Sequence, residues 1–127
     1  MANQDTGMTR LELKALVAAL STNKDPRVRN LFLVIPLLEV VARKYTGFGF
    51  YTKFASKESI KRSDLDEAYL SKHPPEALGL YPGVSGCVNF LVWISNGQVD
   101  CLEAASSWSW PEDETQFVVA AFPEDAA

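Results

Sequence analysis

The dipeptide Asn96-Gly97 is the feature of this sequence that most limits what the chain can fold into. It separates two apolar runs, 86–95 and 98–105, that are rich in β-branched and aromatic residues. Both central residues of a type I′ turn need a positive φ, which asparagine and glycine accept. The stretch therefore predicts a β-hairpin with a two-residue loop. Apolar residues on both faces of 88–94 place this hairpin in the middle of a sheet.

The predicted hairpin also decides which side chains share a face. Counting from the loop places Glu103 opposite Phe90 on a largely apolar face, and Asp100 on the other face. The two carboxylates then form no acid/base pair of the glycosidase kind. Cys87 and Cys101 lie on opposite faces, roughly 17 Å apart along the strands, which is too far for a disulfide. We therefore expect two buried, reduced thiols.

The first helix is predicted from its N-terminal cap. Thr9 and Glu12 have the spacing of a capping box, in which the side chain of each residue accepts a hydrogen bond from the backbone amide of the other. Apolar residues at helical spacing follow, so the sequence predicts a helix over about 10–20. We expect residues 1–8 to form a disordered leader.

A second helix is predicted to begin at Asp25-Pro26, a favoured N-cap followed by a favoured first helical residue. We end it at Ile35, because Pro36 disfavours helical conformation at the residue before it. A kinked helix that continues to Arg43 is the alternative. The segment 31–38 is apolar all round, which indicates burial in either case.

The rest of the chain predicts further strands and loops. Leu38–Tyr45 fits either the end of that helix or a strand, and we favour the strand. The other predicted elements are strands over 46–54 and 116–122, a short helix over 63–70 capped by Ser63, and an irregular loop over 73–86.

Together these elements predict an α+β fold: two N-terminal helices packed on an antiparallel sheet of about four to five strands, with the hairpin central. The length of 127 residues fits one domain. We assign this domain to residues 9–123 and a tail to 124–127. Helices would cover one face of the sheet, and loops or a partner subunit the other, which makes the chain a candidate homodimer.

The charge of the chain restricts its partners. The formal net charge is −4 at pH 7 and no basic stripe is present, so we expect neither nucleic acid nor an anionic membrane as a partner. A basic protein remains a candidate partner. Because we find no secretory signal and no apolar run long enough to span a bilayer, we expect a cytoplasmic protein.

Glu103 is the strongest single candidate for a functional polar group. A carboxylate on an apolar face near a strand end is partly desolvated, which raises its pKa and keeps a proton available. The alternative is a side chain at the sheet rim, in water or bonded to a loop amide.

Trp108 and Trp110 are the strongest candidates for binding, since tryptophan is enriched in interface hot spots and in the walls of ligand sites. The alternative is a lid in which the indoles cover an open end of the sheet. Tyr51 and Lys53 share the glycine-bearing face of their strand and are candidates to line the same cleft. The acidic run from Glu112 to Glu114 would suit a basic protein surface.

No metal or cofactor is predicted. Two separated cysteines and the single histidine, His73, do not have the spacing of a zinc site. The G-x-G at Gly47–Gly49 lies inside a predicted strand rather than between a strand and a helix, so we assign it no phosphate-binding role.

Three stretches together resemble a family of small uncharacterised bacterial proteins. They are 45–54 (YTGFGFYTKF), 96–103 (NGQVDCLE) and 110–112 (WPE). In that family a TGxGFfT strand is followed by a dGxIdxLEg hairpin and a WP loop. The resemblance covers about half of the chain, and Ala104 stands where the family has glycine. It implies no established activity, but some members accompany polymorphic-toxin or mobile regions, which is compatible with an immunity role.

We therefore expect a non-enzymatic protein-binding module, in the form of an immunity-type inhibitor, that uses the Trp108–Glu114 loop and the adjoining sheet rim. One alternative is a small-molecule-binding protein or minor hydrolase with a pocket around Glu103 and Tyr51. Another is a structural subunit whose role is assembly alone.

Overall fold

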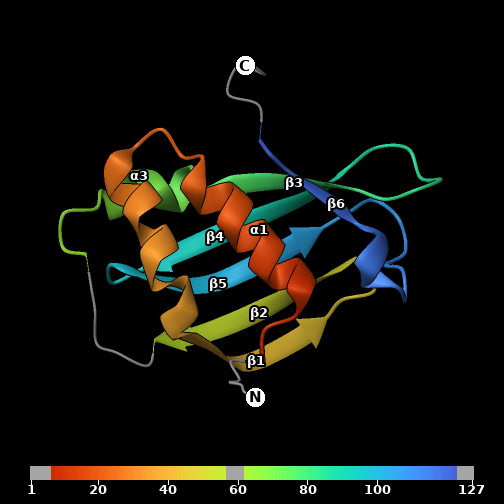
Figure 1. Cartoon of the computed structure of the whole chain (residues 1–127), viewed down its shortest axis with the longest axis horizontal. Coiled ribbons are helices and arrows are strands. Elements are labelled where there is room, and N and C mark those ends of the chain that lie inside the picture. The colour runs from red at the N-terminus through yellow and green to blue at the C-terminus, as the bar shows by residue number, and fades with distance from the viewer. Residues whose placement is uncertain (1–6, 57–61, 123–127) are drawn as a thin grey trace.

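The computed structural model describes residues 7–56 and 62–122, which form an α+β fold around one antiparallel sheet (Figure 1). The described strands number six, where the sequence predicted four to five. In chain order they are β1 (Leu38–Tyr45), β2 (Gly49–Ser56), β3 (Glu76–Leu80), β4 (Val88–Ser95), β5 (Gln98–Ala105) and β6 (Val118–Ala121). Their order across the sheet is β1-β2-β5-β4-β3-β6, so the β4–β5 hairpin is central, as predicted.

The N-terminal helices lie across one face of this sheet (Figure 1). The helical elements are α1 (Arg10–Ser21), α2 (Pro26–Arg29), the 3₁₀ helix η1 (Asn30–Leu37), α3 (Glu67–Lys72) and the 3₁₀ helix η2 (Glu114–Gln116). Among the residues described, no helix is both long enough and apolar enough to cross a bilayer.

The hairpin turn has the predicted conformation, with φ of 54° at Asn96 and 71° at Gly97. It is also held from outside the hairpin. The Glu67 carboxylate accepts hydrogen bonds from the amides of Asn96 at 3.1 Å and Gly97 at 2.5 Å. The Arg62 amide donates to the Gly97 carbonyl at 3.0 Å. The turn is thus reinforced by α3 and by the segment that precedes it.

The register of the hairpin differs from the predicted one because of a β-bulge. Trp93 pairs with Cys101 and Ile94 with Val99, so Asp100 is the extra residue. Every pair beyond the bulge moves by one position, and Glu103 pairs with Leu91 rather than with Phe90. The prediction that Glu103 lies on the face of the buried core residues was therefore wrong.

A buried ion pair attaches α1 to the edge of the sheet. Glu12 is only 1% exposed and completes the predicted capping box with Thr9. Its carboxylate accepts from Arg43 Nε and Nη2, both at 2.7 Å, and from Thr52 Oγ1 at 2.5 Å. The hydrogen bond with Glu12 raises the pKa of the Arg43 guanidinium. One side chain therefore joins α1, β1 and β2.

The second predicted helix begins at Pro26 as expected but keeps α geometry only to Arg29. It continues as η1 through Pro36, because a proline lacks the donor that an α-helix interior needs and 3₁₀ geometry serves in short pieces. Only Leu31 and Ile35 of η1 are buried. The expectation that this whole apolar segment is buried was wrong.

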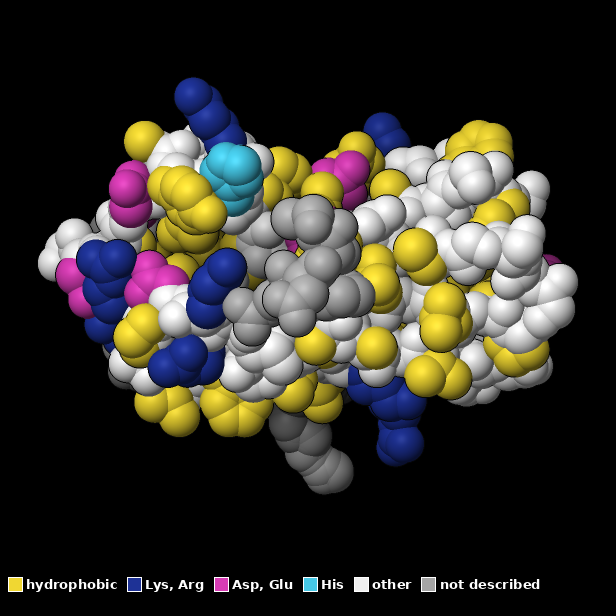
Figure 2. Space-filling model, turned by 90° about the horizontal axis from the view of Figure 1, so that it is seen from above, with side chains coloured by type: hydrophobic (Ala, Val, Ile, Leu, Met, Phe, Trp, Pro, Cys, Tyr) yellow, Lys and Arg dark blue, Asp and Glu magenta, His cyan; other side chains and the backbone are white. Residues whose placement is uncertain are grey.

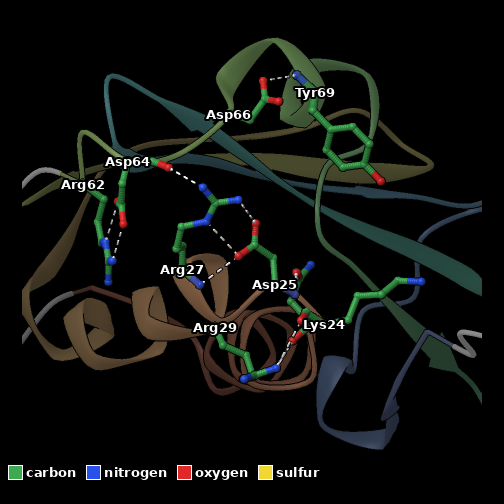
Figure 3. A network of polar contacts seen from close by, with 9 residues as sticks. Lys24, Asp25, Arg27, Arg29, Arg62, Asp64, Asp66 and Tyr69 are labelled. Atoms are coloured by element: carbon green, nitrogen blue, oxygen red, sulfur yellow. Dashed lines mark hydrogen bonds and ion pairs between the residues drawn. The ribbon is translucent and has the colours of Figure 1, made fainter.

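Polar contacts hold the start of α2 against the chain that leads to α3 (Figure 3). Arg27 donates to both carboxylate oxygens of Asp25 and to the Asp64 carbonyl at 3.0 Å. The hydrogen bonds from Arg27 lower the pKa of Asp25. Asp66, rather than the predicted Ser63, caps α3 by accepting from the Tyr69 amide.

The strand β3 lies inside the segment predicted to be an irregular loop. It has five residues and contains Gly79, which weakens the strand signal. The glycine is needed here because a Cβ at this position would lie 2.6 Å from a ring carbon of the buried Phe90. Residues 1–6 of the predicted leader and the predicted tail 124–127 lie outside the described residues.

Candidate functional site

The two tryptophans of the 106–117 loop pack onto one end of the hydrophobic core. Trp110 lies edge-on to the buried Phe50, with ring centroids 5.5 Å apart, and stacks on Phe117 at 5.0 Å. Trp108 stacks on Trp110 at 6.3 Å with an interplanar angle of 13°. The Trp110 amide also donates to the Gly47 carbonyl at 2.8 Å. Both indoles therefore cover the core, as the lid alternative expected.

The outer side of this lid forms a groove of about 440 Å³, which we call the acidic groove. It is lined by Tyr45, Gly47, Trp110, Pro111, Glu112 and Glu114. Glu114 has a structural part in it, because its carboxylate accepts from the Tyr45 hydroxyl at 3.1 Å and from Trp110 Nε1 at 2.8 Å. Burial, and next the negative charge of Glu114, raise the pKa of Tyr45.

The acidic groove combines two aromatic side chains with two carboxylates. Glu112 is exposed, whereas Glu114 is held by its two donors. Such a combination suits a cation, because a guanidinium or ammonium group can lie against an aromatic ring and bond to a carboxylate. Of the predicted binding residues, Trp110 and Glu112 meet in this groove.

Tyr51, Lys53 and Glu103 lie elsewhere, on the sheet face turned away from α1, which we call the open face. Tyr51 pairs with Glu103 across β2 and β5. The nearby Glu103 carboxylate raises the pKa of Tyr51 and also accepts from Trp93 Nε1 at 3.0 Å. The strand neighbour of Tyr51, Phe50, is the residue that contacts Trp110. The prediction of one cleft shared with the tryptophans was therefore wrong.

The bulge brings Asp100 to the open face as well. Lys53 Nζ donates to the Asp100 carboxylate at 3.0 Å. Asp100 and Glu103 were predicted to lie on opposite faces, and this was wrong because the extra residue re-aims the Asp100 side chain. Glu103 and Tyr51 do meet, as the pocket alternative required, but the grooves at the tryptophan loop and beside α1 are lined by other residues.

The helix side carries an apolar groove that the sequence analysis missed. It has a volume of about 300 Å³ between α1 and η1, and we call it the apolar groove. Its lining residues are Leu13, Val17, Phe32, Leu33, Ile35 and Pro36. Leu33 is 70% exposed and Phe32 41%. The sequence contained a signal for this groove. A helix that lies on a sheet buries only one of its sides, so a segment that is apolar on every side must expose some apolar residues.

Two further hollows lie beside α1 and share lining residues with the acidic and apolar grooves. One, lined among others by Lys14, Arg10 and Glu114, shares Glu114 with the acidic groove. The next, of about 570 Å³, shares Arg10 with the first hollow and Leu13 with the apolar groove. These shared residues place Arg10 and Lys14 of α1 between the acidic and the apolar grooves.

Two other predicted features have no part in these grooves. His73 stacks on Tyr69 with ring centroids 4.6 Å apart. Among residues 7–56 and 62–122, no three His, Cys, Asp or Glu side chains lie close enough to hold a metal ion.

Both cysteines are free thiols, as predicted, but Cys87 is exposed and Cys101 half-buried. Cys87 was predicted to be buried because it was assigned to the strand, whereas it precedes β4. Burial raises the pKa of the Cys101 thiol, which lowers its thiolate fraction at neutral pH.

We therefore expect two phases when the native protein reacts with Ellman's reagent at pH 7. Cys87 should react first, and Cys101 about tenfold or more slowly, since Cys101 is half-buried and its raised pKa leaves less of the reactive thiolate. The Cys87→Ser variant should lose the fast phase and the Cys101→Ser variant the slow one. Equal rates for the two thiols would contradict this assignment.

No family model, curated protein sequence or solved structure matches the chain. The resemblance noted in the sequence therefore stays an expectation.

Proposed function

We propose that this protein is a non-enzymatic protein-binding module that recognises a basic partner through the acidic groove. The observation that carries the proposal is the meeting of Tyr45, Trp110, Glu112 and Glu114 around one groove on the outside of the tryptophan loop. An immunity-type inhibitor of a basic toxin is the form of this function that the acidic loop suits best.

The groove offers a cation two kinds of contact. An arginine side chain can place its planar guanidinium against an aromatic ring, worth about 0.5–2 kcal/mol, while its N–H groups donate to the exposed carboxylate of Glu112. The fixed position of Glu114, held by Tyr45 and Trp110, means that this half of the site is formed before the partner arrives. Preformed contacts bind without the entropy cost of ordering side chains.

A direct test uses N-acetyl-arginine amide as the probe and N-acetyl-citrulline amide, which lacks the charge, as its control. We expect the arginine probe to produce saturable shifts in the NMR signals of the Trp110 indole and the Gly47 amide, and the citrulline probe to produce none. Replacing Glu112 by lysine should weaken binding of the arginine probe by about fivefold or more, the equivalent of roughly 1 kcal/mol.

Glu112 is the correct residue to change because Trp110 and Glu114 also hold the loop together. The matched control is Glu39→Lys, which makes the same charge change at an exposed site on β1 outside the groove. It should leave the affinity for the arginine probe unchanged. Equal shifts with both probes, or equal loss of binding in both variants, would rule out recognition by this groove.

A further inference from the structure

We propose that the open face of the sheet is the interface of a homodimer. This inference is independent of the acidic groove, which lies at the end of the core on the tryptophan loop. Side chains alternate between the two faces of the sheet along each strand. Phe50, Thr52 and Phe54 of β2 are buried, so Tyr51 and Lys53 between them point to the opposite face.

The open face carries large apolar side chains across most of its width. On β4, Leu91 and Trp93 are half-buried between their neighbours, and on β2 Tyr51 is 45% exposed. At the far edge Leu80 pairs with Val118, and these two are 51% and 61% exposed. Figure 2, a view onto the β3–β6 edge, shows hydrophobic side chains on both halves of the molecule and most of the visible charged side chains on one half. An apolar face of this extent in water marks an association surface.

The size of the face matches what a dimer needs. Six strands about 4.8 Å apart and about 20 Å long present roughly 580 Å² in projection. Protruding side chains raise the accessible area above this projection, toward the roughly 800 Å² per partner of a standard interface. The other face is already covered by α1 and η1 (Figure 1). A second copy is thus an occupant of the correct size for this surface.

Two charged side chains of the open face, Lys53 and Glu76, favour a second copy as the occupant, because a two-fold axis can bring each one opposite the other. Lys53 lies on β2, and Glu76 lies on β3 at the other side of the central hairpin. A two-fold axis that lies parallel to the strands between β5 and β4 places β2 of each chain over β3 of the other. It also satisfies the closed symmetry of an isologous dimer.

Strand register shows that the two charged groups can reach each other. Glu76 pairs with Leu91, Leu91 with Glu103, and Glu103 with Tyr51. Lys53 is two residues along β2 from Tyr51, so it lies about 7 Å along the strands from the row that ends at Glu76. A lysine side chain spans that offset, so Lys53 of each chain can pair with Glu76 of the other.

The test is a charge exchange followed by sedimentation analysis of the full chain. We expect the native protein to have twice the 14.0 kDa mass of one chain. Lys53→Glu places an acid opposite Glu76, and Glu76→Lys places a base opposite Lys53, so either variant alone should dimerise at least tenfold more weakly. An equimolar mixture of the two variants should restore the dimer, because both interchain pairs then have opposite charges.

Controls keep this result separate from effects on folding. Lys14→Glu makes the same charge change as Lys53→Glu on an exposed site of α1, across the sheet, and should leave the dimer intact. Because Lys53 also pairs with Asp100, Val118→Glu on β6 provides a second way to disrupt the interface without losing that contact. Melting temperatures report folding in each case.

Three results would overturn the homodimer. They are a monomeric native protein at high micromolar concentration, variants that dimerise alone as well as the native chain, or a mixture of the two that stays monomeric. A dimer lost only when Leu33 of the apolar groove becomes glutamate would assign the interface to the helix side instead. Failure of the arginine probe to bind would leave the homodimer untouched, so the two proposals fail separately.

Discussion

Replacing Glu12 by alanine should lower the free energy of unfolding by about 3–5 kcal/mol, the range measured when one partner of a buried ion pair is removed. The variant would leave the Arg43 guanidinium, the Thr52 hydroxyl and the Thr9 amide without the acceptor they share in the native protein. A buried donor that loses its acceptor destabilises the protein by the full free energy of its desolvation. Urea denaturation followed by circular dichroism would measure the change.

A double-mutant cycle would show that the cost comes from the pair. Glu12→Met and Arg43→Met should each be strongly destabilising, whereas the double variant should cost much less than their sum, because no uncompensated charge then remains. Glu39→Ala, at an exposed site on the same strand as Arg43, should change the free energy of unfolding by no more than about 0.5 kcal/mol. Additive single changes would contradict the coupling inferred from the geometry.

Replacing Gly97 by alanine should lower the free energy of unfolding by about 3 kcal/mol, from two sources. The positive φ of 71° is unfavourable for any residue with a Cβ. In addition, the new Cβ would lie 2.3 Å from the Arg62 carbonyl oxygen, so the segment that covers the turn would have to move.

Gly86→Ala is the control that separates these two sources. Gly86 has a φ of +86° but nothing within 4 Å of its Cβ position, so only the backbone cost of about 1–2 kcal/mol applies. The larger loss at Gly97 measures the contact with Arg62. Equal losses at the two glycines would show that this contact contributes nothing to stability.

Local signals in the sequence predicted those elements that are specified by a few adjacent residues. The Asn96-Gly97 turn and the Thr9–Glu12 capping box depend on chemistry within four residues, and both formed as expected. The strand at Leu38–Tyr45 was also correct. These elements need no knowledge of what packs against them.

The structural features that the sequence did not predict depend on contacts between residues far apart in the chain. The bulge at Asp100 has no local marker such as a glycine, yet it moved Glu103 from the core side to the open face. The short strand β3 exists because β4 and β6 lie on both sides of it. Its glycine, a weak strand former, is required by a ring of β4.

The sequence identified individual residues of the candidate site, but it did not show which of them lie together. Trp110 and Glu112 were both identified and do line one groove, because they are neighbours in the chain. Tyr51 and Lys53 were assigned to the same cleft, and only the packing of Phe50 against Trp110 shows that they face the other way. Tyr45, which shapes the groove together with Glu114, was missed because the two residues are 69 positions apart in the chain.

The order of strands across the sheet also sets how the chain must fold. β1 with β2 and β4 with β5 are hairpins whose partners are close in sequence, and such pairs form within microseconds. The two hairpins join only through β2 and β5, which brings Gly49 to Ala105, and β6 closes onto β3 last in the chain. Closing these long loops lowers the conformational entropy of the chain before the contacts between the strands can stabilise it. We therefore expect the docking of the two hairpins to be slower than the formation of each hairpin.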